Sequence, residues 1–141
     1  MLSTTKVLLL SEDQNEVYYL RGSLGSHAVV MHARSLPEMA SKLERTQYDV
    51  VLCGWPFYQD GWHGELKNVR ERYPDLPVIV LSRANTKQKW MDVMDAGAFD
   101  LLGLPSSKPV LLPALEHARV SHDARKMQRA DAAEPAALFA S

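Results

Sequence analysis

Predominantly apolar runs, separated by polar segments, give this 141-residue chain its main pattern. The runs are Val7–Leu10, Ala28–Met31, Asp49–Cys53 and Leu76–Leu81, and a shorter fifth run covers Phe99–Leu102. Continuous apolar runs of this length, ended by polar residues, are typical of strands that are buried on both faces of a sheet. The pattern therefore predicts five strands in the interior of the protein.

The segments between these runs carry apolar residues at three- and four-residue steps, which is typical of amphipathic helices. They are Glu16–Leu24, Leu36–Thr46, Gly64–Tyr73, Thr86–Ala96 and Pro109–Arg129. Strands that alternate with helices favour parallel pairing with right-handed crossovers. We predict an α/β fold: a doubly wound, five-stranded parallel sheet with helices on both faces and an extended C-terminal helix. Functional sites of such folds lie beyond the carboxyl ends of the strands.

The chain has the length of one domain. We expect residues 1–120 to form it, and residues 121–141 to form a helix extension and a flexible tail. The tail is predicted from composition, because the last twelve residues are rich in alanine and include Pro135.

Composition excludes several classes of protein. The net charge is −1 without a dense basic cluster, which argues against nucleic-acid binding. One cysteine, Cys53, excludes an internal disulfide framework and fits a reducing compartment, and we predict that it is a buried structural thiol. The apolar run at Val7–Leu10 is too short for a signal-peptide core or a membrane span. A cytoplasmic protein without membrane contact is expected.

Four landmarks resemble the receiver domain of response regulators, the CheY-like family. The segment Tyr48–Gly54, with Asp60 and Gly61 after it, is similar to the third strand and the loop that carries the phospho-accepting aspartate. Lys6–Asp13 resembles the first strand and its acidic pair. Asp95–Asp100 resembles the Glu-Ala-Gly-Ala-X-Asp turn, and Leu102–Pro105 resembles the strand that ends in Lys-Pro. The resemblance covers nearly all of the predicted domain and implies the flavodoxin-like receiver topology.

The resemblance also implies a phosphorylation site at which key groups are missing. A working receiver uses two acids that bind magnesium, an aspartate nucleophile, a hydroxyl and a lysine. The matching positions hold Ser11 and Glu12, Gly54, Ser82 and Leu104, and Asp13 follows Glu12. We therefore predict a degenerate phosphorylation site, made of Glu12, Asp13, Gly54, Ser82 and Leu104, with no catalytic residue and no enzymatic activity.

No metal ion and no cofactor are expected. Magnesium prefers carboxylate and phosphate oxygens, and two of the acids of the family pattern are replaced by Ser11 and Gly54. An alternative is that Glu12 and Asp13 keep a weak affinity for a divalent ion. The histidines are predicted to be solvated, since His117 and His122, five apart on one helix, lie on different faces. No glycine-rich phosphate loop or dinucleotide fingerprint is present, which argues against an enzyme of another flavodoxin-like family.

Apolar residues outside the predicted core indicate a surface for a partner. In receivers the fourth helix, the fifth strand and the fifth helix form the surface that dimerises or meets partners. We predict partner-binding residues there and in the loop after the third strand, where large apolar groups would either fill the old site or contact a partner. They are Trp90, Met91, Met94, Leu101, Trp55 and Phe57.

These observations predict an atypical receiver domain of phosphorelay-type, two-component signal transduction that acts by phosphorylation-independent protein–protein interaction. The expected partner is a protein of the signalling pathway, or a second copy that forms a homodimer. The alternatives are the receiver module of a transcriptional regulator whose output region or partner lies elsewhere, and a residual receiver that binds divalent ions weakly.

Overall fold

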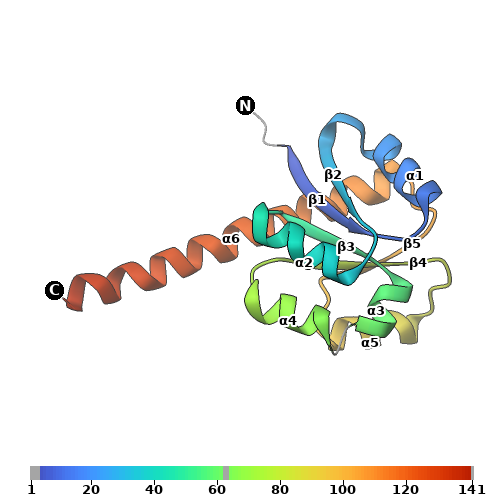
Figure 1. Ribbon diagram of the computed structural model, residues 1–141. Coiled ribbons are helices and arrows are strands. Elements are labelled where there is room, and N and C mark those ends of the chain that lie inside the picture. The colour runs from blue at the N-terminus through green and yellow to red at the C-terminus, as the bar shows by residue number, and fades with distance from the viewer. Residues whose placement is uncertain (1–3, 62–63, 141) are drawn as a thin grey trace.

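The computed structural model describes residues 4–61 and 64–140, with side chains up to residue 129. Its centre is a five-stranded parallel sheet in the order β2-β1-β3-β4-β5. The strands are β1 Thr5–Leu10, β2 Ala28–Ala33, β3 Val50–Gly54, β4 Val78–Ser82 and β5 Asp100–Gly103. β3 is central, and all of its residues are buried. The predicted sheet is therefore confirmed (Figure 1).

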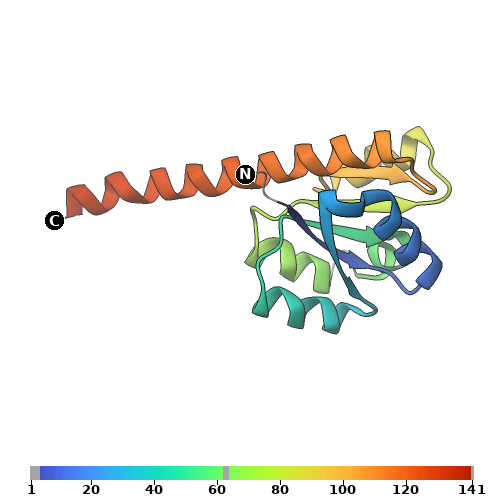
Figure 2. The ribbon, with the colours of Figure 1, turned by 90° about the horizontal axis from the view of Figure 1, so that it is seen from above.

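Helices cover both faces of the sheet. One apolar core lies between the sheet and α1 Gln14–Leu24 and α6 Lys108–Ala140. The second core lies on the other face, under α2 Leu36–Arg45, α3 Trp55–Gly61, α4 Glu65–Arg72 and α5 Lys87–Asp95. A short 3-10 turn, Gly25–His27, leads into β2. Figure 2 shows the sheet between the two layers, and the doubly wound fold is confirmed.

Polar side chains begin several of these helices by accepting hydrogen bonds from free backbone N–H groups. The Asp13 side chain accepts from the N–H of Asn15, and Ser35 does the same for Glu38. Thr86 caps α5 by accepting from the N–H of Lys89. Two of these caps follow the carboxyl ends of β1 and β4, so they also fix the first turns of the helices that border the candidate site.

Cys53 lies in the interior of β3, as predicted. Its side chain is fully buried, and burial raises the pKa of the thiol to about 12. A thiol that stays protonated and has no contact with solvent is a poor nucleophile. Cys53 is therefore a core residue.

The segment after β3 differs from the prediction. A loop was expected from Gly54 to Gly61, but the chain forms the short helix α3 directly after the strand. Pro56 fits the first turn of a helix because the N–H that it lacks would have no partner there. Tyr58 is buried and stacks on Trp55 with ring centroids 5.2 Å apart. Packing of these rings stabilises a turn that the sequence pattern alone does not specify.

The C-terminal helix also differs from the composition-based expectation. α6 continues from Lys108 through Pro135 to Ala140, where a frayed tail was predicted. Figures 1 and 2 show its last turns extending away from the sheet. The division between a domain and a tail at residue 120 stays a prediction. Within the described residues, no helix is both long and apolar enough to cross a membrane.

Candidate functional site

A cleft of about 490 Å³ lies at the carboxyl ends of β1, β3 and β4. The structure brings the predicted degenerate site together there, because all five of its residues line this cleft. They are Glu12, Asp13, Gly54, Ser82 and Leu104. Ser11, Glu16 and Lys89 line it as well. The cleft follows from the parallel sheet, which delivers the ends of three neighbouring strands to one edge.

Gly54 is the last residue of β3 and pairs with Leu81 of β4. It brings no functional group to the floor of the cleft. A Cβ atom at this position would lie 3.2 Å from the carbonyl oxygen of Leu10, which is a tight contact. The end of the central strand therefore offers backbone only.

The acidic side of the cleft is engaged by other groups. Asp13 accepts a hydrogen bond through Oδ1 from the N–H of Asn15, at 2.9 Å. Its Oδ2 lies 3.3 Å from Nη2 of Arg83, in an exposed ion pair. Both carboxylate oxygens have a partner within the chain, which reduces what Asp13 could offer to a metal ion. Glu12 is exposed.

A lysine that the sequence analysis missed supplies a cation to the cleft. Nζ of Lys89 donates to Oγ of Ser82 at 3.0 Å and to the carbonyl oxygen of Ala84 at 2.6 Å. The same ammonium group lies 4.0 Å from the ring centroid of Trp55, which is cation–π geometry. Leu104, which the sequence analysis matched to the lysine position of the family pattern, lines the same cleft. Lys89 lies in the first turn of α5, which Thr86 caps and which is the next element after β4. This position near the carboxyl end of β4 is the sequence signal that could have placed Lys89 at the cleft.

Glu16 is the second residue that sequence reasoning missed. Its side chain is half-buried at the cleft, and Oε1 has no hydrogen-bond partner among the described residues. Burial raises the pKa of Glu16, and the negative charge of Asp13 adds to this shift. Arg83 opposes it. The sequence indicated only the start of a helix at this position, because nothing in the apolar pattern distinguishes a half-buried acid from a solvated one.

Replacing Glu16 with Gln should change how stability depends on pH. The raised pKa means that the folded state binds the Glu16 proton more tightly than the unfolded state does. Protonated Glu16 therefore stabilises the fold below its ordinary pKa, and this stabilisation is lost as pH rises through the folded-state pKa. The variant should therefore melt at a higher temperature than the wild type at pH 7, and the difference should shrink toward pH 4. Melting curves followed by circular dichroism between pH 4 and pH 8 would measure this. A pH-independent difference would contradict the assignment.

Comparison with known proteins adds to this geometry. No family model matches the chain. A curated relative, the "Putative two-component response regulator ARR20" of Arabidopsis thaliana, is 26% identical over 118 residues, which is 83% of this chain and 28% of the relative. The chain thus spans about 28% of the length of that relative.

Solved structures match over most of their own length. A response regulator from Thermotoga maritima superposes with a TM-score of 0.75 at 23% identity, over 84% of this chain and 99% of that one. A two-component response regulator from Clostridium difficile superposes with a TM-score of 0.70 at 21% identity, over 82% of this chain and 95% of that one. A CheY-like protein (tadZ) from Pseudomonas aeruginosa superposes with a TM-score of 0.69 at 20% sequence identity, over 82% of this chain and 99% of that one. The chain has the response-regulator receiver fold. These structures share the fold of this chain, and the sequence relative is a further similarity to a response regulator.

On this receiver fold, the predicted partner surface divides into exposed and buried residues. Trp90 and Met91 on α5 are 45% and 42% exposed. Met94 is half-buried. Leu101 is buried in the core at 7% exposure, so its inclusion among the partner-binding residues was wrong. Leu101 lies in β5, whose side chains pack beneath the helix layer.

Trp55 and Phe57 are partly buried against the core and line the cleft. Of the two roles that the sequence left open for them, the structure favours filling the old site. Neither ring lies free on the surface in the way that Trp90 does.

One histidine prediction was wrong. His117 is exposed as expected, but His122 is 8% exposed. Leu115, Ala118 and His122 follow one another at helical spacing on the face of α6 that packs on the receiver sheet, which explains the burial. The five-residue separation correctly predicted different faces, but it did not reveal which of the two faces packs inward.

Proposed function

We propose that this chain is an atypical receiver module of two-component signal transduction that works by protein–protein interaction, without phosphorylation of an aspartate. One observation carries the proposal: the cleft at the strand ends has Gly54 where the nucleophile belongs and Leu104 where the lysine belongs. Phosphoryl transfer depends on positioned charge and on an oxygen nucleophile in line with the phosphorus. Neither requirement is met at those two positions.

The polar contacts of the cleft support this proposal. Lys89 donates to Ser82, and Arg83 pairs with Asp13. A hydroxyl and an acid that would serve phosphate and magnesium therefore have partners from the chain itself. We infer that these contacts hold the loops after β1 and β4 in one arrangement, without a phosphoryl group or an ion.

Mass spectrometry after exposure to acetyl phosphate and Mg²⁺ tests the proposal. The intact wild-type protein should gain no phosphoryl group. A gain that maps to Glu12, Asp13 or another side chain of the cleft would contradict the proposal.

A variant with Ser11→Asp, Gly54→Asp and Leu104→Lys is the matched control. It returns the side chains of the family pattern to the same fold, and it should gain a phosphoryl group if the rest of the cleft permits the reaction. The tight contact of a Cβ at position 54 with the carbonyl oxygen of Leu10 requires a shift of a few tenths of an ångström. Folding of the variant should therefore be checked by circular dichroism.

The expected partner is a protein of the signalling pathway, which would contact Trp90 and Met91, or a second copy of the chain through α5, β5 and α6. The alternative function, the receiver module of a larger transcriptional regulator, is favoured by one observation: the curated relative is more than three times as long as the matched region. In both cases we expect the receiver itself to make protein contacts and to leave any nucleic-acid contact to another region.

A further inference from the structure

Three potential metal ligands meet at the end of the sheet opposite the cleft. Asp49 directly precedes β3, and His122 and Asp123 are neighbours on α6. One ligand atom from each residue lies within 4.8 Å of the other two. Residues that are more than 70 positions apart in the sequence are brought together here, because α6 crosses the sheet beside the start of its central strand.

The buried member of this group lacks a hydrogen-bond partner. His122 is 8% exposed, and its Nδ1 atom has no hydrogen-bond partner among the described residues. Oδ1 of Asp49 lies 3.6 Å from Nδ1, and Oδ1 of Asp123 lies 3.9 Å from it. Both distances are longer than a hydrogen bond. A buried polar atom without a hydrogen-bond partner destabilises the folded state, so a group that binds Nδ1 would be stabilising.

The two carboxylates are held in place by their other oxygens. Oδ2 of Asp49 accepts from the backbone N–H of Lys6 at 2.8 Å, and the N–H of Asp49 donates to the carbonyl oxygen of Lys6 at 2.8 Å. Oδ2 of Asp123 lies 3.5 Å from Nη1 of Arg119. Each aspartate is thus oriented through one oxygen and turns the other toward His122. Orientation of ligands by outer hydrogen bonds is typical of metal sites.

We propose that Asp49, His122 and Asp123 bind a divalent transition-metal ion of the zinc class. Zinc bonds to histidine nitrogen and carboxylate oxygen are about 2.0–2.2 Å long, so neighbouring ligands of a tetrahedral ion lie about 3.4 Å apart. The observed separations of 3.6 and 3.9 Å are close to this value. An imidazole with two carboxylates suits zinc better than magnesium, which favours oxygen ligands in an octahedron.

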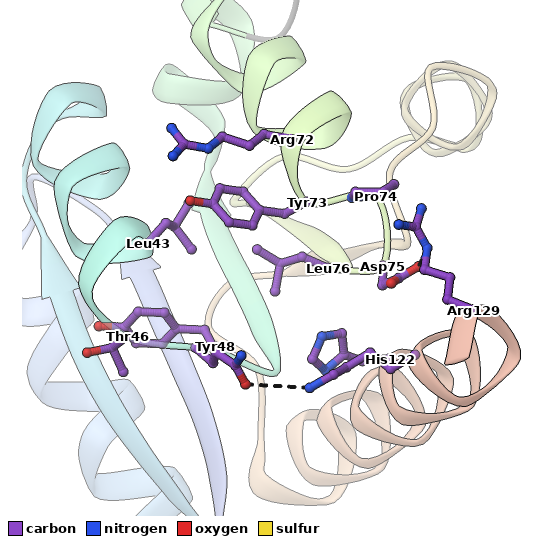
Figure 3. A pocket seen from close by; sticks show the side chains of 12 residues that line it. Leu43, Thr46, Tyr48, Arg72, Tyr73, Pro74, Asp75, Leu76, His122 and Arg129 are labelled. Atoms are coloured by element: carbon purple, nitrogen blue, oxygen red, sulfur yellow. Dashed lines mark hydrogen bonds and ion pairs between the residues drawn. The ribbon is translucent and has the colours of Figure 1, made fainter. Parts of the chain in front are cut away.

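The fourth ligand would be water from an adjoining pocket. Figure 3 shows His122 at the wall of a pocket of about 230 Å³, near Tyr48 and Leu76. Three cations also line this pocket, and each has a partner. Nη1 of Arg72 lies 3.0 Å from Oε1 of Glu44, Nζ of Lys126 lies 3.5 Å from Oε1 of Gln47, and Nε of Arg129 lies 3.0 Å from Oδ1 of Asp75.

A bound ion would connect the start of β3 to α6 through coordination bonds to the three side chains. Because Asp49 is also bonded to Lys6, the connection would include β1. An ion that binds only the folded state raises the melting temperature as its concentration rises. A bound ion would therefore hold α6, at His122 and Asp123, against the start of β3.

Titration of the tag-free, full chain with ZnCl₂, followed by isothermal calorimetry, tests the site. One ion should bind per chain. Asp123→Asn and Asp49→Asn should each weaken binding by at least about 10-fold, the scale at which even outer-sphere groups act on metal affinity. Asp49→Asn keeps an oxygen that can accept from the N–H of Lys6, so the fold should be retained. His122→Gln should remove measurable binding.

Two matched controls separate this site from adventitious binding. Glu116→Gln removes a carboxylate on α6 that also pairs with Arg119, at 2.6 Å, and His117→Gln removes an exposed imidazole from the same helix. Both should bind zinc as the wild type does. Absence of one-to-one binding by the wild type would overturn the proposal. Unchanged affinity in Asp49→Asn and Asp123→Asn, or a loss of binding in Glu12→Gln instead, would do the same and would place the ion elsewhere.

Discussion

Replacing Leu52 with alanine should lower the free energy of unfolding by about 2–5 kcal/mol. Leu52 is fully buried in β3, between Leu9 of β1 and Ile79 of β4. Its side chain belongs to the core beneath α1 and α6, where the sheet leaves no contact with solvent. Removal of three buried carbon atoms loses their transfer free energy and leaves a cavity that a central strand cannot close by moving.

Urea unfolding followed by circular dichroism would measure the effect. Val120→Ala is the matched control, because Val120 is 51% exposed on α6 and its truncation should change the free energy of unfolding by less than about 0.5 kcal/mol. A loss below about 1 kcal/mol for Leu52→Ala would mean that the two helices repack over the shortened side chain, and that the tightly buried centre described above is wrong.

The double variant Trp90→Asp, Met91→Asp should weaken binding of the protein partner by about 30-fold or more. An aromatic anchor at the centre of an interface typically accounts for 2 kcal/mol or more, and a buried carboxylate in its place adds a desolvation cost. Both side chains are exposed on α5, so the fold should tolerate the change. Copurification with both baits would identify the partner, and its affinity for each purified chain would give the ratio.

Tyr18→Asp is the control for this experiment, because Tyr18 is 79% exposed on α1, on the other face of the sheet. It should bind as the wild type does. Equal binding by the double variant would exclude the α5 surface and make Trp55 and Phe57 the next candidates. If the partner is a second copy of the chain, sedimentation should show a dimer for the wild type and a monomer for the double variant.

The features that the sequence predicted well are those set by a repeated pattern over many residues. The apolar runs at Val7–Leu10 and Leu76–Leu81 lead to the strands β1 and β4, because the buried faces of a parallel sheet need such residues. The order of elements then places the ends of β1, β3 and β4 at one edge, so Glu12, Gly54 and Ser82 could be assigned to one site from their positions alone.

The features that the sequence did not predict depend on which way single side chains point. Lys89 reaches back from α5 to Ser82, and no periodicity encodes a hydrogen bond between the end of a strand and a helix residue seven positions later. Leu101 and Trp90 are both apolar and close in the fold, yet one is buried and the other exposed. The burial of His122 depends on the angle at which α6 crosses the sheet, which packing determines.

The length of α6 gives the receiver a mechanical lever. A helix of 33 residues is about 50 Å long, and the portion beyond Asp123 accounts for about 25 Å of it. If α6 tilts as a rigid rod by about 10° at its contact with the start of β3, the far end is displaced by about 4 Å, a geometric consequence of that length. Subtle repacking beside Asp49 would thus be amplified into a movement comparable in size to a side chain, at a site remote from the sheet.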